Sequence, residues 1–315
     1  MDTKKSPLKR LLFLFLPFIF LFVYDILASL VSVVIERGLT LFSVSDKFLS
    51  SSASFMDASI AFVLSIICYI FYRTVFTKRE PEVRISKPTG VIYAIILGFG
   101  AGGISSLWLN GVYILADYSP FLAKQVKGFD SLYSDMEKGP YIWLFLAIVV
   151  VGPIIEEILF RGIIFSSFEN ATRSSWFPVI ITGVMFGIWH GSFIQGVYTA
   201  IFGMILAYFM KKCRSLVFVA FAHGINNLSG TLPPSLDTDF TNTLLNVTSY
   251  VCILPTLAIL YHLHRKSKKI TNSYDTFRDL LSLIHGVKQF KNHLFIRKKR
   301  LPKFMANAFI GCNIC

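Results

Sequence analysis

Residues 141–168 read YIWLFLAIVVVGPIIEEILFRGIIFSSF. The stretch is apolar and longer than the roughly 20 residues that a helix needs to cross a bilayer. It nevertheless holds three ionisable side chains, Glu156, Glu157 and Arg161. Each would cost about 2.5–3.5 kcal/mol at the centre of a membrane helix. A helix that keeps three such groups is expected to turn them toward the interior of a helical bundle, where they can find partners or serve a function.

The composition of the whole chain is also that of a membrane protein. Of 315 residues, 54% are hydrophobic and 16% charged, with a mean hydropathy of +0.61. Soluble domains have roughly 45–50% apolar and about 25% charged residues. We therefore predict an all-α polytopic membrane bundle of about eight transmembrane helices. Its apolar runs cover residues 11–35, 55–73, 89–116, 141–168, 176–192, 193–210, 215–230 and 243–264.

The net charge of +13 comes from Lys and Arg residues that gather at the chain ends and in alternate loops. Basic residues in short loops stay on the cytoplasmic side, so both termini are expected in the cytoplasm. A nucleic-acid binder would instead combine its basic residues with stacking aromatics, and no nucleic-acid partner is expected. The pattern predicts a multi-pass protein of the cell membrane, with the lipid bilayer as its surroundings.

Three regions follow from this pattern. Residues 1–139 hold the first three membrane helices and their loops, and residues 140–264 form a membrane core that carries the ionisable groups. Residues 265–315 form a basic tail with 12 Lys and Arg residues against Asp275 and Asp279. Apolar tail positions recur at helical spacing, which favours an amphipathic helix on an anionic leaflet. A disordered end is the alternative.

Glycines recur within two of the apolar runs. Gly98, Gly100 and Gly103 fit the pattern G-x-G-x-x-G, but no strand precedes them, so a nucleotide site is not indicated. Small residues four apart, such as Gly98 and Gly102, let membrane helices approach closely. The same spacing returns at Gly183, Gly187 and Gly191. Both stripes predict tight helix packing.

Glu157 and Arg161 lie four residues apart, so they share a helix face and can form an ion pair. Glu156 points about 100° away from that face. It is left without the cation, which favours a separate task for this carboxyl group. Pro153 removes one backbone hydrogen bond just before the pair and is expected to distort the helix there.

Two further runs carry polar groups. His190 ends the sequence Phe186-Gly-Ile-Trp-His190, and His223 begins His223-Gly-Ile-Asn-Asn227. Because residues four apart share a face, Phe186 is expected to support His190, and Asn227 to point the same way as His223. Two histidines, an asparagine and two glutamates on three membrane helices predict one shared functional site.

Two kinds of chemistry fit this set of residues. In peptide hydrolysis, a Glu can activate water, and His and Asn side chains can stabilise the oxyanion. Alternatively, Glu156, His190 and His223 could hold a zinc ion and leave a fourth position for water. The sequence contains no H-E-x-x-H motif and leaves both versions open.

The order and spacing of these three motifs resemble the CPBP family of intramembrane proteases (CAAX protease and bacteriocin-processing, also called Abi). The resemblance covers about residues 140–230. It implies that Glu156 activates water, that His190 assists it, and that His223 and Asn227 stabilise the oxyanion. Glu157 and Arg161 match positions with a supporting role. It also implies an eight-helix bundle with a cavity open toward the cytoplasm and lipid.

We therefore expect a CAAX-protease-like intramembrane endopeptidase, either a glutamate protease or a metalloendopeptidase, that cleaves a peptide or membrane-protein substrate near the cytoplasmic leaflet. A non-proteolytic bacteriocin-immunity or membrane scaffold protein is the alternative from another class. A transporter that uses the same acids as a proton relay is a third reading, although no inverted repeat is evident. Axial rise places His190 about 20 Å from the cytoplasmic face but His223 about 12 Å, a difference that a tilted helix or a later start of the helix before His190 would remove.

Overall fold

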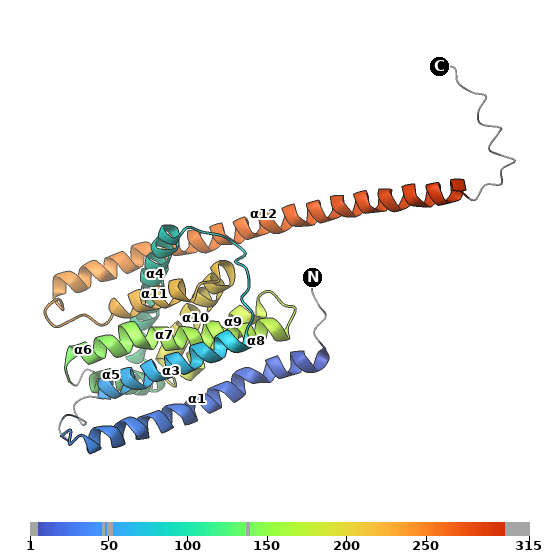
Figure 1. Cartoon of the computed structure of the whole chain (residues 1–315). Coiled ribbons are helices and arrows are strands. Elements are labelled where there is room, and N and C mark those ends of the chain that lie inside the picture. Colours follow the sequence, from blue (N-terminus) through green and yellow to red (C-terminus); the bar gives the residue numbers. More distant parts are fainter. Residues whose placement is uncertain (1–5, 46–47, 49–52, 137–138, 300–315) are drawn as a thin grey trace, which may run out of the picture. The chain divides into compact units, whose positions relative to one another are not determined.

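The computed structural model describes residues 6–45, 48, 53–136 and 139–299, of which 132–136 and 271–299 are described by their backbone alone. Every regular element in these ranges is helical (Figure 1). The helices before the central segment are α1 (Pro7–Leu41), α3 (Ala53–Val75), α4 (Lys87–Ala116) and α5 (Pro120–Met136). The central segment consists of α6 (Tyr141–Leu144), η1 (Phe145–Val151), α7 (Gly152–Glu157), η2 (Ile158–Ile164) and α8 (Phe165–Ala171). It is followed by α9 (Phe177–Trp189), α10 (Phe193–Cys213), α11 (Leu216–Leu228) and α12 (Asp239–Lys299).

All eight predicted apolar runs are helical, which confirms the all-α polytopic class. Within the described ranges, six helical segments are long and apolar enough to cross a membrane. They are α1, α3, α4, α10, the central segment Tyr141–Ala171 and the part Asp239–Ile270 of α12. The remaining two, α9 and α11, have 13 residues each and reach about 20 Å, less than the hydrocarbon core of a typical bilayer. The cytoplasmic placement of both termini stays a prediction.

The central segment changes its helical geometry around Pro153. The π-helices η1 and η2 lie on either side of α7, which begins with Gly152 and Pro153 and ends with Glu157. Proline has no amide hydrogen and its ring crowds the preceding turn, and a locally widened helix accommodates both effects. The expected distortion is therefore present as two π segments, and they bracket the two glutamates.

The first glycine stripe packs α4 against two other helices. A methyl group at Gly98 would lie 2.6 Å from the carbonyl oxygen of Ala222 in α11. Methyl groups at Gly100 and Gly103 would lie 2.1 Å and 2.4 Å from atoms of Thr256 and Ser249 in α12. Contacts this short require glycine, so the G-x-G-x-x-G pattern serves helix packing, as predicted.

The second stripe joins α9 to α10. A methyl group at Gly187 would lie 2.3 Å from the carbonyl oxygen of Gly196, and one at Gly183 would lie 2.8 Å from that of Ala200. Gly191 does not take part in this packing. Its φ of +69° ends the helix after His190, and a methyl group there would meet nothing within 4 Å.

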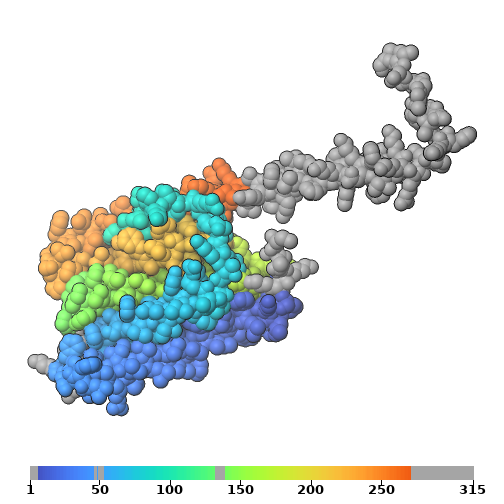
Figure 2. Space-filling view, in the orientation of Figure 1, coloured from blue at the N-terminus to red at the C-terminus, as the bar shows by residue number. Residues whose placement is uncertain are grey.

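The chain forms two compact units, Met1–Leu263 and His264–Cys315. Within the first unit, α1 lies along one edge of the bundle beside α3 (Figures 1 and 2), and it buries Pro17 and Tyr24 while much of its surface is apolar and exposed. In the second unit, α12 continues to Lys299. The structure describes residues 271–299 by their backbone alone, and residues 300–315 lie outside the described residues. The amphipathic pattern of the tail depends on these side chains and stays a prediction.

Candidate active site

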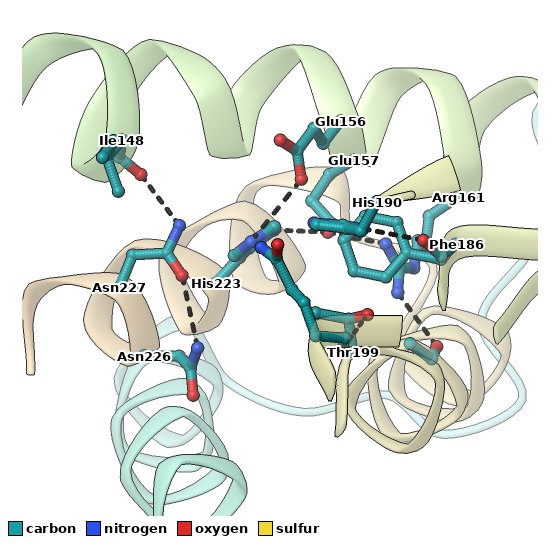
Figure 3. Close-up of polar contacts among 12 residues, drawn as sticks. Ile148, Glu156, Glu157, Arg161, Phe186, His190, Thr199, His223, Asn226 and Asn227 are labelled. Atoms are coloured by element: carbon teal, nitrogen blue, oxygen red, sulfur yellow. Dashed lines mark hydrogen bonds and ion pairs between the residues drawn. The ribbon is translucent and has the colours of Figure 1, made fainter. Parts of the chain in front are cut away.

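A fully buried ion pair lies at the centre of the bundle. Arg161 Nη1 donates to Glu157 Oε1 at 2.8 Å, and both side chains have no exposed surface. Arg161 Nη2 donates to the carbonyl oxygen of Gly203 in α10 at 3.0 Å, and the guanidinium lies 4.6 Å from the centre of the Phe186 ring. The predicted pairing is therefore present, and the buried charges are compensated by each other and by hydrogen bonds (Figure 3).

His223 of α11 joins this pair. Its Nδ1 lies 2.9 Å from Glu157 Oε1, and because an ionised carboxylate can only accept, Nδ1 carries the hydrogen. The imidazole is 3% exposed and its ring packs against Phe186 and Phe202 at centroid distances of 5.8 Å and 5.1 Å. Packing and the hydrogen bond thus fix the ring, and its Nε2 faces Glu156 Oε2 at 3.7 Å.

The two adjacent glutamates have different surroundings. Glu157 is buried and binds both Arg161 and His223, whereas the side chain of Glu156 is 21% exposed. The Oε2 atom of Glu156 is buried and accepts no hydrogen bond from the described residues. The Oε2 atom of Glu157 likewise accepts no hydrogen bond from the described residues, so the two acids differ in exposure and in the partners of Glu157 Oε1.

His190 follows the last residue of α9 and stands beside the same aromatic ring. Its Nδ1 lies 2.7 Å from the carbonyl oxygen of Phe186, and since a backbone carbonyl only accepts, Nδ1 donates and Nε2 keeps a lone pair when the ring is neutral. The rings of Phe186 and His190 meet edge to face at 4.6 Å between centroids. Phe186 contacts both His190 and His223, which brings the two histidines together.

Asn227 binds the central segment. Its Nδ2 donates to the carbonyl oxygen of Ile148 in η1 at 2.9 Å, and its Oδ1 accepts from Nδ2 of Asn226 at 3.2 Å (Figure 3). Sequence reasoning did not select Asn226 or the carbonyl groups of Ile148 and Gly203. The neighbouring asparagine was visible in the motif, but backbone carbonyl partners have no sequence signature.

The predicted site residues therefore come together from three parts of the chain. Glu156, Glu157 and Arg161 come from the central segment, His190 and Phe186 from the end of α9, and His223 and Asn227 from α11 (Figure 3). The catalytic roles implied by the resemblance stay predictions.

The donor set does not make a ready zinc site. In the part of the chain that the structure describes, no group of three His, Cys, Asp or Glu residues is arranged to hold a metal ion. His190 and His223 each use Nδ1 for a hydrogen bond, to the Phe186 carbonyl and to Glu157, so Nε2 is the atom that either ring could offer to a metal. Zinc binding by Glu156, His190 and His223 stays a prediction.

Six apolar candidate spans define a multi-pass membrane protein. Residues 138–229 match the family described as "Type II CAAX prenyl endopeptidase Rce1-like". This range contains every predicted site residue. The chain is also 25% identical over 171 residues to "Putative membrane peptidase YdiL" of Bacillus subtilis (strain 168).

That alignment covers 54% of this chain and 65% of the relative, so the matched part spans less than two thirds of the relative's length. No solved structure matches the chain. The family match and the relative both support the resemblance of this part of the chain to the CPBP/Abi family.

Proposed function

We propose that this protein is an intramembrane endopeptidase, similar to CAAX proteases, in which Glu156 activates the attacking water. The observation that carries the proposal is the arrangement of two adjacent carboxylates about one imidazole. Glu157 holds Nδ1 of His223 at 2.9 Å, while Glu156, partly exposed and unpaired at Oε2, stands 3.7 Å from Nε2. Perturbed or unpaired acids beside a fixed histidine are typical of acid–base sites.

In the first step, Glu156 takes a proton from water while the water oxygen bonds to the carbonyl carbon of the scissile peptide bond. His190 supports this step, because its Nε2 is an acceptor when Nδ1 donates to the Phe186 carbonyl. When the tetrahedral intermediate collapses, the carbon–nitrogen bond breaks and Glu156 passes its proton to the leaving amine. One group thus serves first as base and then as acid.

The intermediate carries negative charge on the former carbonyl oxygen. His223 can stabilise this charge by donating a hydrogen bond from Nε2 when both ring nitrogens carry a hydrogen. Asn227 uses one Nδ2 hydrogen for Ile148 and has a second for the oxyanion. Removal of one such donor typically lowers kcat about 10²–10³-fold.

The position of His223 supports cleavage near the cytoplasmic leaflet. It lies seven residues after Leu216, about 10 Å along α11 from the helix start. The last turn of α10 holds Lys211 and Lys212, and Arg214 follows it, and basic residues at such a loop are expected on the cytoplasmic side. The substrate is accordingly a peptide or membrane protein that reaches this depth from the cytoplasmic side.

The test compares purified wild type with Glu156→Gln in proteoliposomes, using a randomised library of fluorophore–quencher peptides. We expect the variant to lose at least about 10³-fold in cleavage rate, as for other general bases. Glu36→Gln is the matched control, because Glu36 is an exposed residue of α1. Cleavage by Glu156→Gln at the wild-type rate refutes the role of Glu156. A wild type that binds library peptides without product supports the non-proteolytic alternative.

A further inference from the structure

The side-chain amide of Asn227 is held at both ends. A backbone carbonyl can only accept, so the contact with Ile148 requires Nδ2 of Asn227 to face η1. The Oδ1 atom of Asn227 must then face the other way, where Nδ2 of Asn226 donates to it at 3.2 Å. The Ile148 carbonyl thus determines the orientation of both amides.

The Ile148 carbonyl is available because of Pro153. In η1 the hydrogen bonds run from residue i+5 to residue i, and the amide of Gly152 accordingly donates to Ala147. The next amide in that register belongs to Pro153, which has no hydrogen to give to Ile148. The carbonyl freed in this way turns to the side chain of Asn227 on α11.

The helices approach closely at this contact. A methyl group at Gly224 would lie 2.8 Å from the carbonyl oxygen of Val149, so a glycine is needed for α11 to reach η1. This position is one helical turn before Asn227 and beside Ile148. The approach therefore sets the 2.9 Å hydrogen bond between Asn227 and Ile148.

The side-chain amide of Asn226 leaves one of its two polar atoms without a hydrogen bond. Its Oδ1 is buried and accepts no hydrogen bond from the described residues, which is unfavourable for a polar atom in a membrane protein. A methyl group at Gly102 of α4 would lie 3.5 Å from this oxygen, so α4 covers the amide. The side chain of Asn226 donates one hydrogen bond, to Oδ1 of Asn227.

We propose that Asn226 and Pro153 are positioning residues that clamp the amide of Asn227, so that one Nδ2 hydrogen is presented to the reacting carbonyl oxygen. The proposal rests on the proposed role of Asn227 in hydrolysis. Asn226 occupies the oxygen end of the amide and Pro153 frees the carbonyl that anchors the nitrogen end. If either hydrogen bond is removed, Asn227 can rotate and turn its own oxygen toward the developing negative charge.

A double-mutant cycle tests the clamp with the peptide library in proteoliposomes. We expect Asn227→Ala to lower kcat about 10²–10³-fold and Asn226→Ala at least about tenfold, with KM little changed in each. In the Asn227→Ala background, Asn226→Ala should have almost no further effect, because its target is gone. Independent, multiplicative losses overturn the proposal. Ser229→Ala is the matched control, since it removes a hydrogen bond to the backbone of Asn226 and leaves both amides intact.

A second measurement tests the two hydrogen bonds of the Asn227 amide without relying on activity. In nanodiscs, protein labelled with ¹⁵N-asparagine should show an Asn227 Nδ2 resonance with one proton shifted by its bond to Ile148. Asn226→Ala and Pro153→Ala should move this resonance, and Ser229→Ala should not. An unmoved resonance in both variants overturns the clamp. If the resonance moves but wild type cleaves no library peptide, the proposed function fails while the clamp stands.

Discussion

His223 donates from Nδ1 to the Oε1 atom of Glu157, and the same oxygen accepts from Arg161. The next acid along the chain, Glu156, stands 3.7 Å from the opposite nitrogen of the imidazole. Adjacent helical residues point about 100° apart, which lets two neighbouring glutamates approach two edges of one ring. Glu157 thus holds one nitrogen of the imidazole, and Glu156 faces the other.

Glu157→Gln should lower the cleavage rate without much change in substrate affinity. A neutral amide can donate to Nδ1 of His223 and so select the wrong tautomer of the imidazole. We expect at least about a 10²-fold loss in kcat with KM within about a factor of three. Glu80→Gln is the control, because Glu80 forms a mostly exposed pair with Arg84. A large rise in KM with unchanged kcat would contradict this role for Glu157.

Arg161→Leu should destabilise the protein. The variant leaves the carboxylate of Glu157 buried without its cation, which typically costs about 3–5 kcal/mol. Arg84→Leu breaks an ion pair of the same i,i+4 spacing whose side chains are 85% and 79% exposed, and should change stability by less than about 1 kcal/mol. Thermal unfolding in detergent measures both. Equal melting temperatures for the two variants would show that the buried pair is dispensable.

The sequence was sufficient to predict the class of fold and which residues meet. Helical spacing predicted the pairing of Glu157 with Arg161, and each of the eight hydrophobic runs contains a helix, although no run predicted α5. The glycines of α4 could be assigned to packing because no strand precedes them. Such inferences need only local periodicity and the free-energy penalty of placing polar groups in lipid.

Other features depend on contacts that local sequence does not encode. The hydrogen bond between His223 and Glu157 could not be predicted, since it depends on the rotation of α11 relative to the central segment. The π-helical turns beside Pro153 and the freed carbonyl of Ile148 are also products of tertiary packing. Asn226 was overlooked for the same reason, because its partner is selected by the orientation of Asn227.

Gly183→Ala should separate α9 from α10. A methyl group there would lie 2.7 Å from the backbone nitrogen of Met204 and 2.8 Å from the carbonyl oxygen of Ala200, so backbone must shift. We expect a loss of about 1–3 kcal/mol in unfolding free energy. Gly38→Ala in α1, where an added methyl group meets nothing within 4 Å, should leave stability unchanged or slightly raised. Guanidinium or thermal melts of both variants provide the comparison, and equal stability would contradict the close helix contact.

Removal of metal ions should leave peptide cleavage unchanged. The described residues contain no arrangement of three ligating side chains. The measurement is the rate of library cleavage before and after dialysis against a chelator, with metal content determined on the same samples by mass spectrometry. Loss of activity that is restored by stoichiometric zinc would show that Glu156, His190 and His223 rearrange to bind the ion. In that case Glu156→Gln should lower the bound zinc together with the rate, whereas a general base would lower the rate alone.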